Sequence, residues 1–304
     1  MNPKHIILTL LLMLCPIGMA SQSTITRNKP KPAVTKPKPA AKPKAKPKPA
    51  PRRNSTNHSN NTSHSSSTSS TVSLSAELNK LINNMVYVSG GTFTMGATSE
   101  QGSEAESDEK PTHSVTLSSY YICKYEVTQA LWRAVMGSNP SYFKGDNLPV
   151  ESVSWNDCQT FINRLNSYTG RNFRLPTEAE WEFAARGGNY SRRYKYSGSN
   201  YIDDVAWYGD NSGDRTHPVG TKQANELGLY DMSGNVWEWC SDWYGSYSSY
   251  SQSNPTGANS GSSRVNRGGC WNYFAKICRS SNRSIDAPSN RCNYLGLRLV
   301  LSQL

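Results

Sequence analysis

The chain has 304 residues, a formal net charge of +11 at pH 7 and 18% charged side chains. Residues 1–76 contain twelve Lys or Arg and no acid, whereas residues 77–304 contain 21 bases and 22 acids. A nucleic-acid groove needs basic residues clustered on the folded part, so this distribution argues against a nucleic-acid partner.

The N-terminus has the pattern of a secretory signal peptide over residues 1–20. Lys4 gives the positive charge, residues 6–14 the short apolar core, and residues 18–20 a small-residue cleavage site. The apolar core is too short to span a bilayer, so no transmembrane span is expected after cleavage. Lipid anchoring at Cys15 is not expected, because a bulky leucine directly precedes it. We therefore expect a secreted, periplasmic or cell-surface protein.

Residues 21–74 are predicted to be a disordered linker. Its first part, residues 27–51, alternates Lys with Pro and Ala, which favours an extended chain close to polyproline II. Its second part, residues 52–74, consists mostly of Ser, Thr, Asn and His and has too few apolar side chains to form a core. We expect a spacer; the alternative is contact between the basic segment and an anionic surface.

The folded domain is predicted over residues 75–304, which is enough chain for one sizeable core. Residues 188–262 are rich in Gly, Ser, Asn and Tyr and show little periodicity, and such a long irregular stretch usually carries a site or ordered ions. The architecture expected is α+β with much ordered loop. The predicted elements, in chain order, are a helix over 75–82, a hairpin of strands 85–88 and 92–95, a strand over 114–122, helices over 128–136 and 154–165, a helix opened by the capping box Thr177–Glu180, and strands over 264–269 and 294–300.

Six cysteines remain beyond the signal peptide, an even number in an oxidising compartment. Six cysteines allow fifteen pairings, among which the sequence cannot choose, and buried free thiols are the alternative. No Cys-x-x-Cys motif occurs, which argues against a zinc ribbon or a thioredoxin-type site. The six are Cys123, Cys158, Cys240, Cys270, Cys278 and Cys292.

The loop over residues 228–240 is rich in oxygen ligands. Asp231, Gly234, Asn235 and Glu238 lie within eight residues. Two carboxylates, an amide and a glycine-bent backbone suit a hard cation such as Ca²⁺. The alternative is a tight turn, since Asp, Ser, Gly and Asn are common turn residues.

Eight ordered segments carry a recognisable pattern. They are Gly90 to Gly96, Pro111-x-His113, Tyr125 to Thr128, Pro149 to Trp155, Phe173 to Ala184, Gly228 to Trp239, Arg267 to Gly269 and Gly296 to Arg298. Together they resemble the formylglycine-generating enzyme, or sulfatase-modifying factor, family across residues 85–302. The resemblance implies a variant of the C-type lectin fold, with little regular secondary structure and bound Ca²⁺.

The resemblance implies two calcium sites. For the first, the ligands would be the side chains of Asp231 and Glu238 and the backbone oxygens of Gly234 and Val236. For the second, the nearest candidates are Asp204 and Asn211, for which a solvated turn is the alternative.

The reaction of the family is the copper-dependent oxidation of a substrate cysteine to formylglycine, which needs a Cys-x₄-Cys pair to hold Cu⁺. Counted from Gly269, the first cysteine of that pair falls on Tyr273 and the second on Cys278. No Cys-x₄-Cys occurs in the chain, and Cys270 and Cys278 have seven residues between them. A phenol is a poor ligand for Cu⁺, so a structural disulfide or buried thiols explain the two cysteines at least as well.

The sequence therefore favours a non-catalytic binding or scaffolding module at the cell envelope. Its ligand would be a protein or peptide, or an envelope polymer; the alternative is a formylglycine-generating oxidase that uses Cys278 and Cys270. His113 and His217 are too few for the three-histidine iron site of the family's sulfoxide synthases. Arg279, Arg283 and Arg298 are expected to form buried ion pairs; the alternative is that they line the groove where the family holds its peptide. The candidates for an aromatic binding surface, with core packing as the alternative, are Trp207, Tyr208, Trp243, Tyr244, Tyr247, Tyr250 and Trp271.

Overall fold

The computed structural model describes residues 65–302. The predicted signal peptide, Cys15 and the linker up to residue 64 lie outside the described residues, so these predictions stay predictions. Within the part of the chain that is described, no helix is long and apolar enough to cross a membrane.

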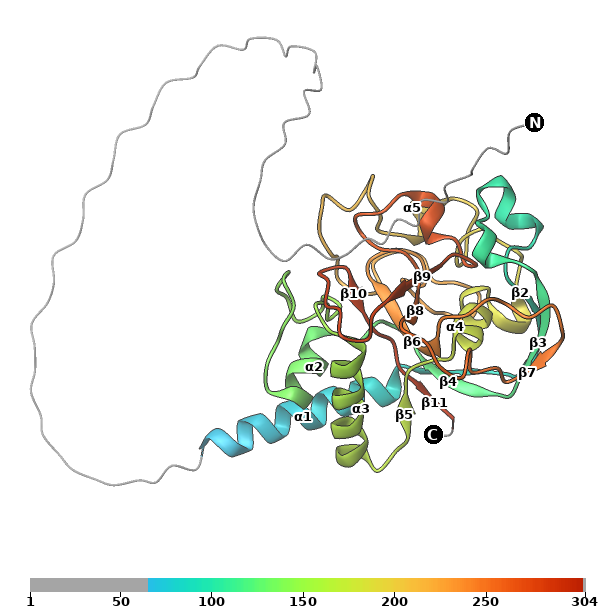
Figure 1. The fold of residues 1–304 in the computed structure, drawn as a ribbon. Coiled ribbons are helices and arrows are strands. Elements are labelled where there is room, and N and C mark those ends of the chain that lie inside the picture. The colour runs from blue at the N-terminus through green and yellow to red at the C-terminus, as the bar shows by residue number, and fades with distance from the viewer. Residues whose placement is uncertain (1–64, 303–304) are drawn as a thin grey trace, which may run out of the picture. The chain divides into compact units, whose positions relative to one another are not determined.

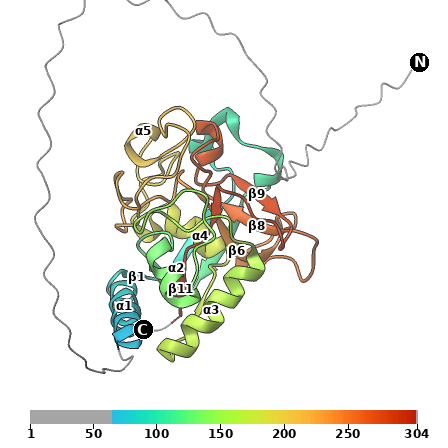
Figure 2. The same ribbon diagram turned by 90° about the vertical axis from the view of Figure 1, so that its left-hand side faces the viewer.

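Three helices lie together on one side of the domain, and the strands and long loops lie on the other (Figures 1 and 2). They are α1 (Ser65–Asn83), α2 (Gln129–Met136) and α3 (Trp155–Thr169). α2 packs between the other two and contacts both. Helices were predicted in all three of these regions.

The helix starts follow from local capping. Thr128 and Ser154 are the N-caps of α2 and α3, and each accepts a hydrogen bond from a backbone N–H three residues later. The predicted capping box Thr177–Glu180 is confirmed at the start of α4 (Glu178–Ala185). These helices therefore begin at the predicted positions.

α1 begins ten residues earlier than predicted, so residues 65–74, which were expected in the linker, are helical. The helix was expected over 75–82 but extends from Ser65 to Asn83. Its C-terminal part packs on α2 and supplies a nucleus. Once nucleated, a helix extends readily through Ser and Thr, whose helix propensities are only moderately unfavourable.

The predicted hairpin of residues 85–95 is wrong, because its two strands do not pair with each other. β1 (Met85–Val88) pairs with β4 (Tyr120–Cys123), and β2 (Gly91–Met95) pairs with β3 (His113–Leu117). Both pairs keep one antiparallel register, so the four strands form a single ribbon that bends at Gly90. A Cβ atom on Gly90 would lie 2.5 Å from the Leu117 carbonyl oxygen, so only glycine fits this corner.

Three small sheets result from this ribbon and the later strands. Their strand orders are β1-β4-β11-β5, β10-β6-β8-β9 and β2-β3-β7. The predicted strand over 264–269 is confirmed as β8, whereas the one over 294–300 is divided between β10 and β11 in different sheets. The remaining strands are β5 (Phe173–Arg174), β6 (Trp237–Trp243), β7 (Gln252–Ser253), β8 (Arg264–Arg267), β9 (Arg283–Asp286), β10 (Leu295–Gly296) and β11 (Val300–Leu301).

The predicted irregular stretch of residues 188–262 contains β6, a central strand that the sequence did not reveal. Most residues of β6 are buried whichever face of the sheet they point to. The alternation that identifies a half-buried strand is therefore absent. The rest of the stretch is ordered loop with α5 (Ile202–Val205), β7 and one short 3₁₀ helix (Gly188–Tyr190). Other 3₁₀ helices are Ser99–Glu104, Ser107–Glu109 and Ala275–Cys278.

α4 lies at the centre of the domain and contacts β2, β3, β6 and β8. All eight of its residues are buried, including three glutamates. Its apolar residues Ala179, Trp181 and Phe183 belong to the main core, together with Val115, Ile122, Val265 and Val300 from the strands. The buried glutamates must therefore be neutralised by residues from the surrounding elements.

Candidate functional site

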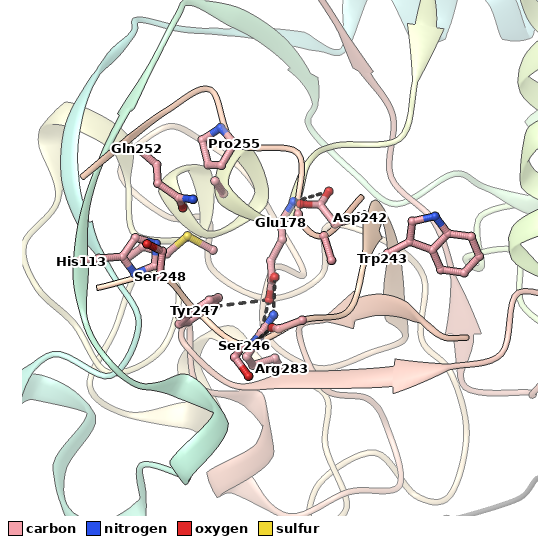
Figure 3. Close-up of a pocket in the computed structure, with 15 residues that line it drawn as sticks. His113, Glu178, Asp242, Trp243, Ser246, Tyr247, Ser248, Gln252, Pro255 and Arg283 are labelled. Carbon is pink, nitrogen blue, oxygen red and sulfur yellow. Dashed lines mark hydrogen bonds and ion pairs between the residues drawn. The ribbon is translucent and has the colours of Figure 1, made fainter. Parts of the chain in front are cut away.

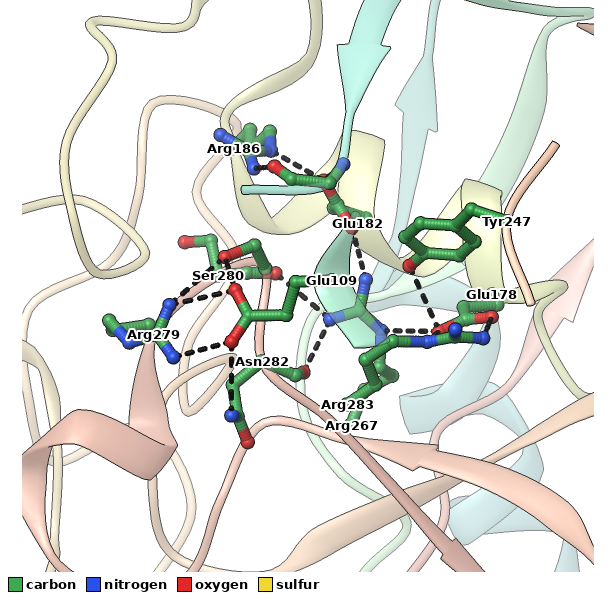
Figure 4. Close-up of polar contacts among 12 residues, drawn as sticks. Glu109, Glu178, Glu182, Arg186, Tyr247, Arg267, Arg279, Ser280, Asn282 and Arg283 are labelled. Atoms are coloured by element: carbon green, nitrogen blue, oxygen red, sulfur yellow. Dashed lines mark hydrogen bonds and ion pairs between the residues drawn. The ribbon is translucent and has the colours of Figure 1, made fainter. Parts of the chain in front are cut away.

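The three glutamates of α4 are neutralised by arginines, and Figure 4 shows the pairs of Glu178 and Glu182. Glu178 shows the arrangement: one of its oxygens lies 2.6 Å from Nη2 of Arg283, and the other lies 3.2 Å from Nε of Arg267. Burial raises the pKa of Glu178, but the charges of Arg283 and Arg267 more than offset this, and the net shift is downward. The pairs are Glu178 with Arg283 and Arg267, Glu180 with Arg174, and Glu182 with Arg186 and Arg267.

A second buried pair joins the 3₁₀ helix at Glu109 to Arg279, two side chains that are both fully buried. The guanidinium lies 2.8 Å from one carboxylate oxygen, and Ser281 donates to the same carboxylate. Burial raises the pKa of Glu109, but the hydrogen bonds from Arg279 and Ser281 outweigh it and the net shift is downward. The predicted buried ion pairs of Arg279, Arg283 and Arg298 are thus confirmed, and these arginines hold the fold together.

The loop over residues 228–240 has the bent backbone that its composition indicates. Asp231, Gly234 and Asn235 all have positive φ angles, of 57°, 81° and 60°. Asp231 Oδ2 accepts the backbone N–H of Gly220 at 2.7 Å, whereas Asp231 Oδ1 is buried without a hydrogen-bond partner. Glu238 accepts two kinds of donor, the Arg298 guanidinium and the Trp181 indole, each at 2.7 Å.

These residues fit a calcium ion only in part. The bare oxygen of Asp231 is a suitable hard ligand. Glu238 is not available in the same way, because both of its oxygens are occupied by Arg298 or Trp181 and the guanidinium already supplies a positive charge. Among residues 65–302, no group of three or more His, Cys, Asp or Glu side chains is arranged to hold a metal ion. The calcium ligands Asp231, Gly234, Val236 and Glu238 therefore stay a prediction.

The candidates for the second calcium site have other partners. Asp204 accepts a hydrogen bond from Ser199 at 2.9 Å. Asn211 donates to the carbonyl of Ala206 and accepts from the backbone N–H of Tyr208, both at 2.9 Å. These contacts close a turn, in agreement with the alternative reading of both residues.

Cys270 and Cys278 are free and fully buried. Burial raises the pKa of the Cys278 thiol to about 12, although hydrogen bonds from the backbone of Cys270 and Gly234 lower it. Burial also raises the pKa of Cys270 well above its usual value. Both side chains are therefore protonated at neutral pH, and a thiol in this state is a poor nucleophile and a poor metal ligand.

Tyr273, at the position that the resemblance assigns to the first copper cysteine, lies among aromatic side chains. Its ring centroid is 5.9 Å from that of Tyr294. Nearby, Trp271 donates to the carbonyl of Asn293 and packs edge-on against Phe143, which in turn contacts Tyr142. We call Tyr142, Phe143, Trp271, Tyr273 and Tyr294 the aromatic row; it consists of two ring-contact groups, Tyr142–Phe143–Trp271 and Tyr273–Tyr294, joined along the chain by residues 271–273. It draws on three separate segments, and only Trp271 was predicted as a binding residue.

The other predicted aromatic residues have varied roles. Tyr208 is buried, and Trp207 stacks on His217 with centroids 3.7 Å apart. Trp243 covers Arg264, while Tyr244 and Tyr247 both pack over Arg283. Tyr250 is 80% exposed. Packing thus accounts for most of this set.

The two histidines of the folded part are packing residues, as expected. His113 lies against Tyr247, with ring centroids 5.0 Å apart. His217 stacks on Trp207, and its Nε2 is 2.6 Å from the carbonyl oxygen of Ser212.

The loop that presents Tyr142 and Phe143 is held by a buried acid, Glu151. Glu151 Oε1 accepts the backbone N–H of Phe143 at 2.8 Å, and Oε2 accepts the Ser152 hydroxyl at 2.7 Å. Burial raises the pKa of Glu151 to about 7, and these hydrogen bonds only partly oppose the rise. The end of the aromatic row is therefore coupled to one titrating carboxyl.

We expect Glu151→Gln to flatten part of the pH dependence of stability. Because the folded-state pKa lies above the ordinary 4.5, the stabilisation is fully present below about pH 4.5 and is lost as the pH rises through about 7. The share of the wild-type loss between pH 5 and pH 8 that is due to Glu151 should be about 1–3 kcal/mol, measured by urea unfolding as the difference from Glu151→Gln. Asp146→Asn, at an exposed acid, should keep the wild-type profile over this range. An unchanged slope in Glu151→Gln would contradict the assignment.

The sequence did not single out Asp242, at the end of β6. This residue is 3% exposed and lines a pocket. The only local indication in the sequence is that this acid stands among the aromatic residues of 237–243, and that segment was not identified as a strand. The pocket is formed by segments far apart in the chain, so local patterns could not reveal it.

The ribbon, the three small sheets and the long ordered loops define a formylglycine-generating-enzyme-like variant of the C-type lectin fold. The Treponema denticola variable protein 1 superimposes with a TM-score of 0.66 at 34% identity, covering 72% of this chain and 95% of that one. PvdO from Pseudomonas aeruginosa superimposes with a TM-score of 0.64 at 29% identity, covering 72% and 94%. The chain belongs to the sulfatase-modifying factor enzyme 1-like domain family, whose profile matches residues 71–303.

Curated relatives carry different names. The chaperone protein LppX of Paenibacillus barcinonensis is 41% identical over 212 residues, covering 53% of this chain and 72% of that protein. The formylglycine-generating enzyme of Mus musculus is 34% identical over 194 residues, covering 59% of this chain and 50% of the enzyme. The chain thus matches only half the length of the mouse enzyme, and membership of the family does not by itself assign an activity.

Proposed function

We propose that the chain is a non-catalytic recognition domain that binds a peptide segment of a protein partner, outside the cytoplasm, through the aromatic row. One observation carries the proposal. At the copper-binding positions implied by the family resemblance, this chain has Tyr273 among aromatic rings and Cys278 as a buried, protonated thiol. An oxidase would need accessible thiolates there.

The aromatic row suits binding because rigid aromatic side chains offer large contact areas at a low cost in conformational entropy. Tyr142 is 71% exposed, and Phe274, close to the row in sequence, is 74% exposed. Trp271 is held in place by its hydrogen bond to the Asn293 carbonyl. A buried, hydrogen-bonded aromatic residue such as Trp271 next to an exposed ring such as that of Tyr142 is typical of a recognition surface.

The relatives support a protein ligand. The Paenibacillus barcinonensis relative is named a chaperone, and chaperones bind other proteins. The predicted signal peptide would place the domain at the cell envelope, and the Lys/Pro-rich segment of residues 27–51 would act as its spacer.

Selection of phage-displayed peptides on the full chain tests the proposal. Peptides that are enriched should bind the Tyr142→Ala/Tyr273→Ala variant at least tenfold more weakly, since about 1.4 kcal/mol corresponds to a factor of ten. The matched control is Tyr190→Ala/Tyr250→Ala, which removes two tyrosines that are 69% and 80% exposed outside the row. Equal binding to both variants would contradict the role of the row. If the chain binds envelope polysaccharide and no peptide, the ligand of the aromatic row is a polymer.

The oxidase alternative is tested on the same protein. Reduced full-length chain is titrated with Cu⁺ and then incubated with a cysteine-containing peptide under oxygen. We expect no stoichiometric Cu⁺ site and no aldehyde product, because both thiols are buried and protonated. An aldehyde on the peptide would overturn the non-catalytic assignment.

We retain calcium binding at the loop of residues 228–240 as part of the proposal, with Asp231 as its central ligand. At a Ca²⁺ concentration 100-fold above Kd, binding would stabilise the fold by about 2.7 kcal/mol relative to EDTA. This corresponds to a rise in Tm of about 5–10 °C for a domain of this size. Asp231→Asn should abolish most of the rise. A Tm that is identical in Ca²⁺ and EDTA would contradict calcium binding.

A further inference from the structure

A pocket of about 140 Å³ lies beside α4, and its lining includes neither Cys270, Cys278 nor any residue of the aromatic row (Figure 3). Its walls come from the start of β3, the end of β6, β9 and the loop of residues 244–258. They combine the Asp242 carboxylate and the Glu178–Arg283 ion pair with the rings of His113 and Tyr247 and with the polar side chains of Ser248 and Gln252. None of these residues belongs to the proposed peptide-binding surface.

Two hydrogen bonds hold the Asp242 side chain through one carboxylate oxygen, and neither of them uses the other oxygen. Its Oδ2 accepts the backbone N–H of Glu178 at 3.0 Å and the Ser241 hydroxyl at 2.8 Å. Among the described residues, no hydrogen bond or ion pair reaches its Oδ1, and the residue lines the pocket. That oxygen is therefore available to accept a hydrogen bond from a ligand.

Asp242 also differs from the acids around it in having no arginine. Its neighbours on α4, Glu178 and Glu180, are paired with Arg283 and Arg174. Arg264, on β8, is directed instead to the carbonyl of Ser241 and the ring of Trp243. Burial and the charge of Glu178 raise the pKa of Asp242 to about 7. This carboxylate therefore lacks the cation that each of its neighbours has.

We propose that this pocket binds a primary ammonium group on a short alkyl chain, as at the end of a lysine side chain, with Asp242 Oδ1 as its charged partner. An ammonium carries three donors. Ser248 and Gln252 offer further acceptor oxygens, and the Tyr247 and His113 rings supply a wall for the alkyl chain and the cation. At about 30 Å³ per water-sized atom, the pocket holds roughly five heavy atoms, the size of butylammonium. The inference does not depend on the peptide-binding proposal.

Isothermal titration of the full chain with Nα-acetyl-lysine amide tests the proposal. The matched ligand is Nα,Nε-diacetyl-lysine amide, which has the same stem without the charge. We expect the charged probe to bind at least tenfold more tightly than the neutral one. Equal affinity for the two, or displacement of the charged probe by neutral monosaccharides at equal concentration, would overturn the proposal.

Variants separate binding from folding. Asp242→Asn keeps an acceptor for the Glu178 N–H and removes the charge, so we expect a loss of at least tenfold in affinity with no fall in Tm. Asp286→Asn is the matched control, because Asp286 is a partly buried acid with a raised pKa outside the pocket. It should bind like wild type. Retained affinity in Asp242→Asn would overturn the role of the carboxylate.

Binding should also strengthen from pH 6 to pH 8, because a proton on Asp242 competes with the ammonium. The other groups that face Asp242, namely Glu178, Glu180, Arg174, Arg264 and Arg283, are either paired or permanently charged, and His113 lies across the pocket. The same trend in Asp242→Asn would assign the effect to His113 and contradict the proposal.

The ammonium could come from a separate molecule or from the lysines at positions 29–48 of this chain. Replacing these lysines by glutamine distinguishes the two sources. Tighter binding of the added probe in the replaced chain would show that the chain's own lysines compete for the pocket. Unchanged binding would assign the site to an external amine.

Discussion

Replacing Arg298 with methionine is expected to cost about 3–5 kcal/mol of folding free energy, the range for removing one partner of a buried ion pair. Arg298 is fully buried and lies 2.7 Å from Glu238. It also donates to the carbonyls of Cys123 and Tyr230. The variant would leave Glu238 charged and without a cation in the core. Urea unfolding measures this loss of stability, and the Tm should fall by about 10–15 °C.

Two further variants make the Arg298 prediction specific. Adding Glu238→Gln to Arg298→Met removes the stranded charge and should recover a substantial part of the lost stability. Arg133→Met removes an exposed partner of Asp146, whose side chains are 47% and 65% exposed, and should cost less than about 0.5 kcal/mol. A loss in Arg298→Met as small as in Arg133→Met would contradict the assignment of Arg298 as a structural cation.

The second large effect is expected from Gly234→Ala in the loop of residues 228–240. Gly234 has a φ angle of 81°, and a Cβ atom there would lie 2.3 Å from the Trp207 carbonyl oxygen. That oxygen cannot easily move away, because it also accepts the backbone N–H of Asn235 at 2.8 Å. Left-handed strain of about 1–2 kcal/mol and overpacking of about 1–3 kcal/mol should together destabilise the fold by about 2–5 kcal/mol.

Gly213→Ala is the matched control for this substitution. Gly213 also has a positive φ angle, of 64°, but an added Cβ atom there would meet nothing within 4 Å. It should show only the backbone strain of about 1–2 kcal/mol. Chemical unfolding of both variants separates the two effects. Equal losses would mean that the close approach of Gly234 to Trp207 does not constrain the loop.

Both predictions concern features that the sequence located but did not explain. The loop of residues 228–240 was identified from its composition, and calcium was expected to hold Glu238. In the structure, Arg298 and Trp181 occupy that carboxylate. The partners lie about 60 residues away in the chain, and only the fold brings them together.

The sequence by itself determined the starts of α2, α3 and α4, the alternation within β3 and the family. The reason is that an N-cap such as Ser154 or Thr177, or the alternation of β3, acts within a few residues. The single strand expected over 114–122 is wrong, because the chain turns after Leu117 and forms β3 and β4. The family could be identified because several motifs occur together in the expected order. The absence of a Cys-x₄-Cys pair was equally visible without any structure.

Only the tertiary structure decided which residues meet. The strands expected as a hairpin pair elsewhere, because the ribbon bends at Gly90 and continues into two sheets. The burial of β6 on both faces hid it from any pattern. The protonated state of Cys278 and the unpaired oxygen of Asp242 likewise depend on burial, and burial depends on side chains contributed by distant segments of the chain.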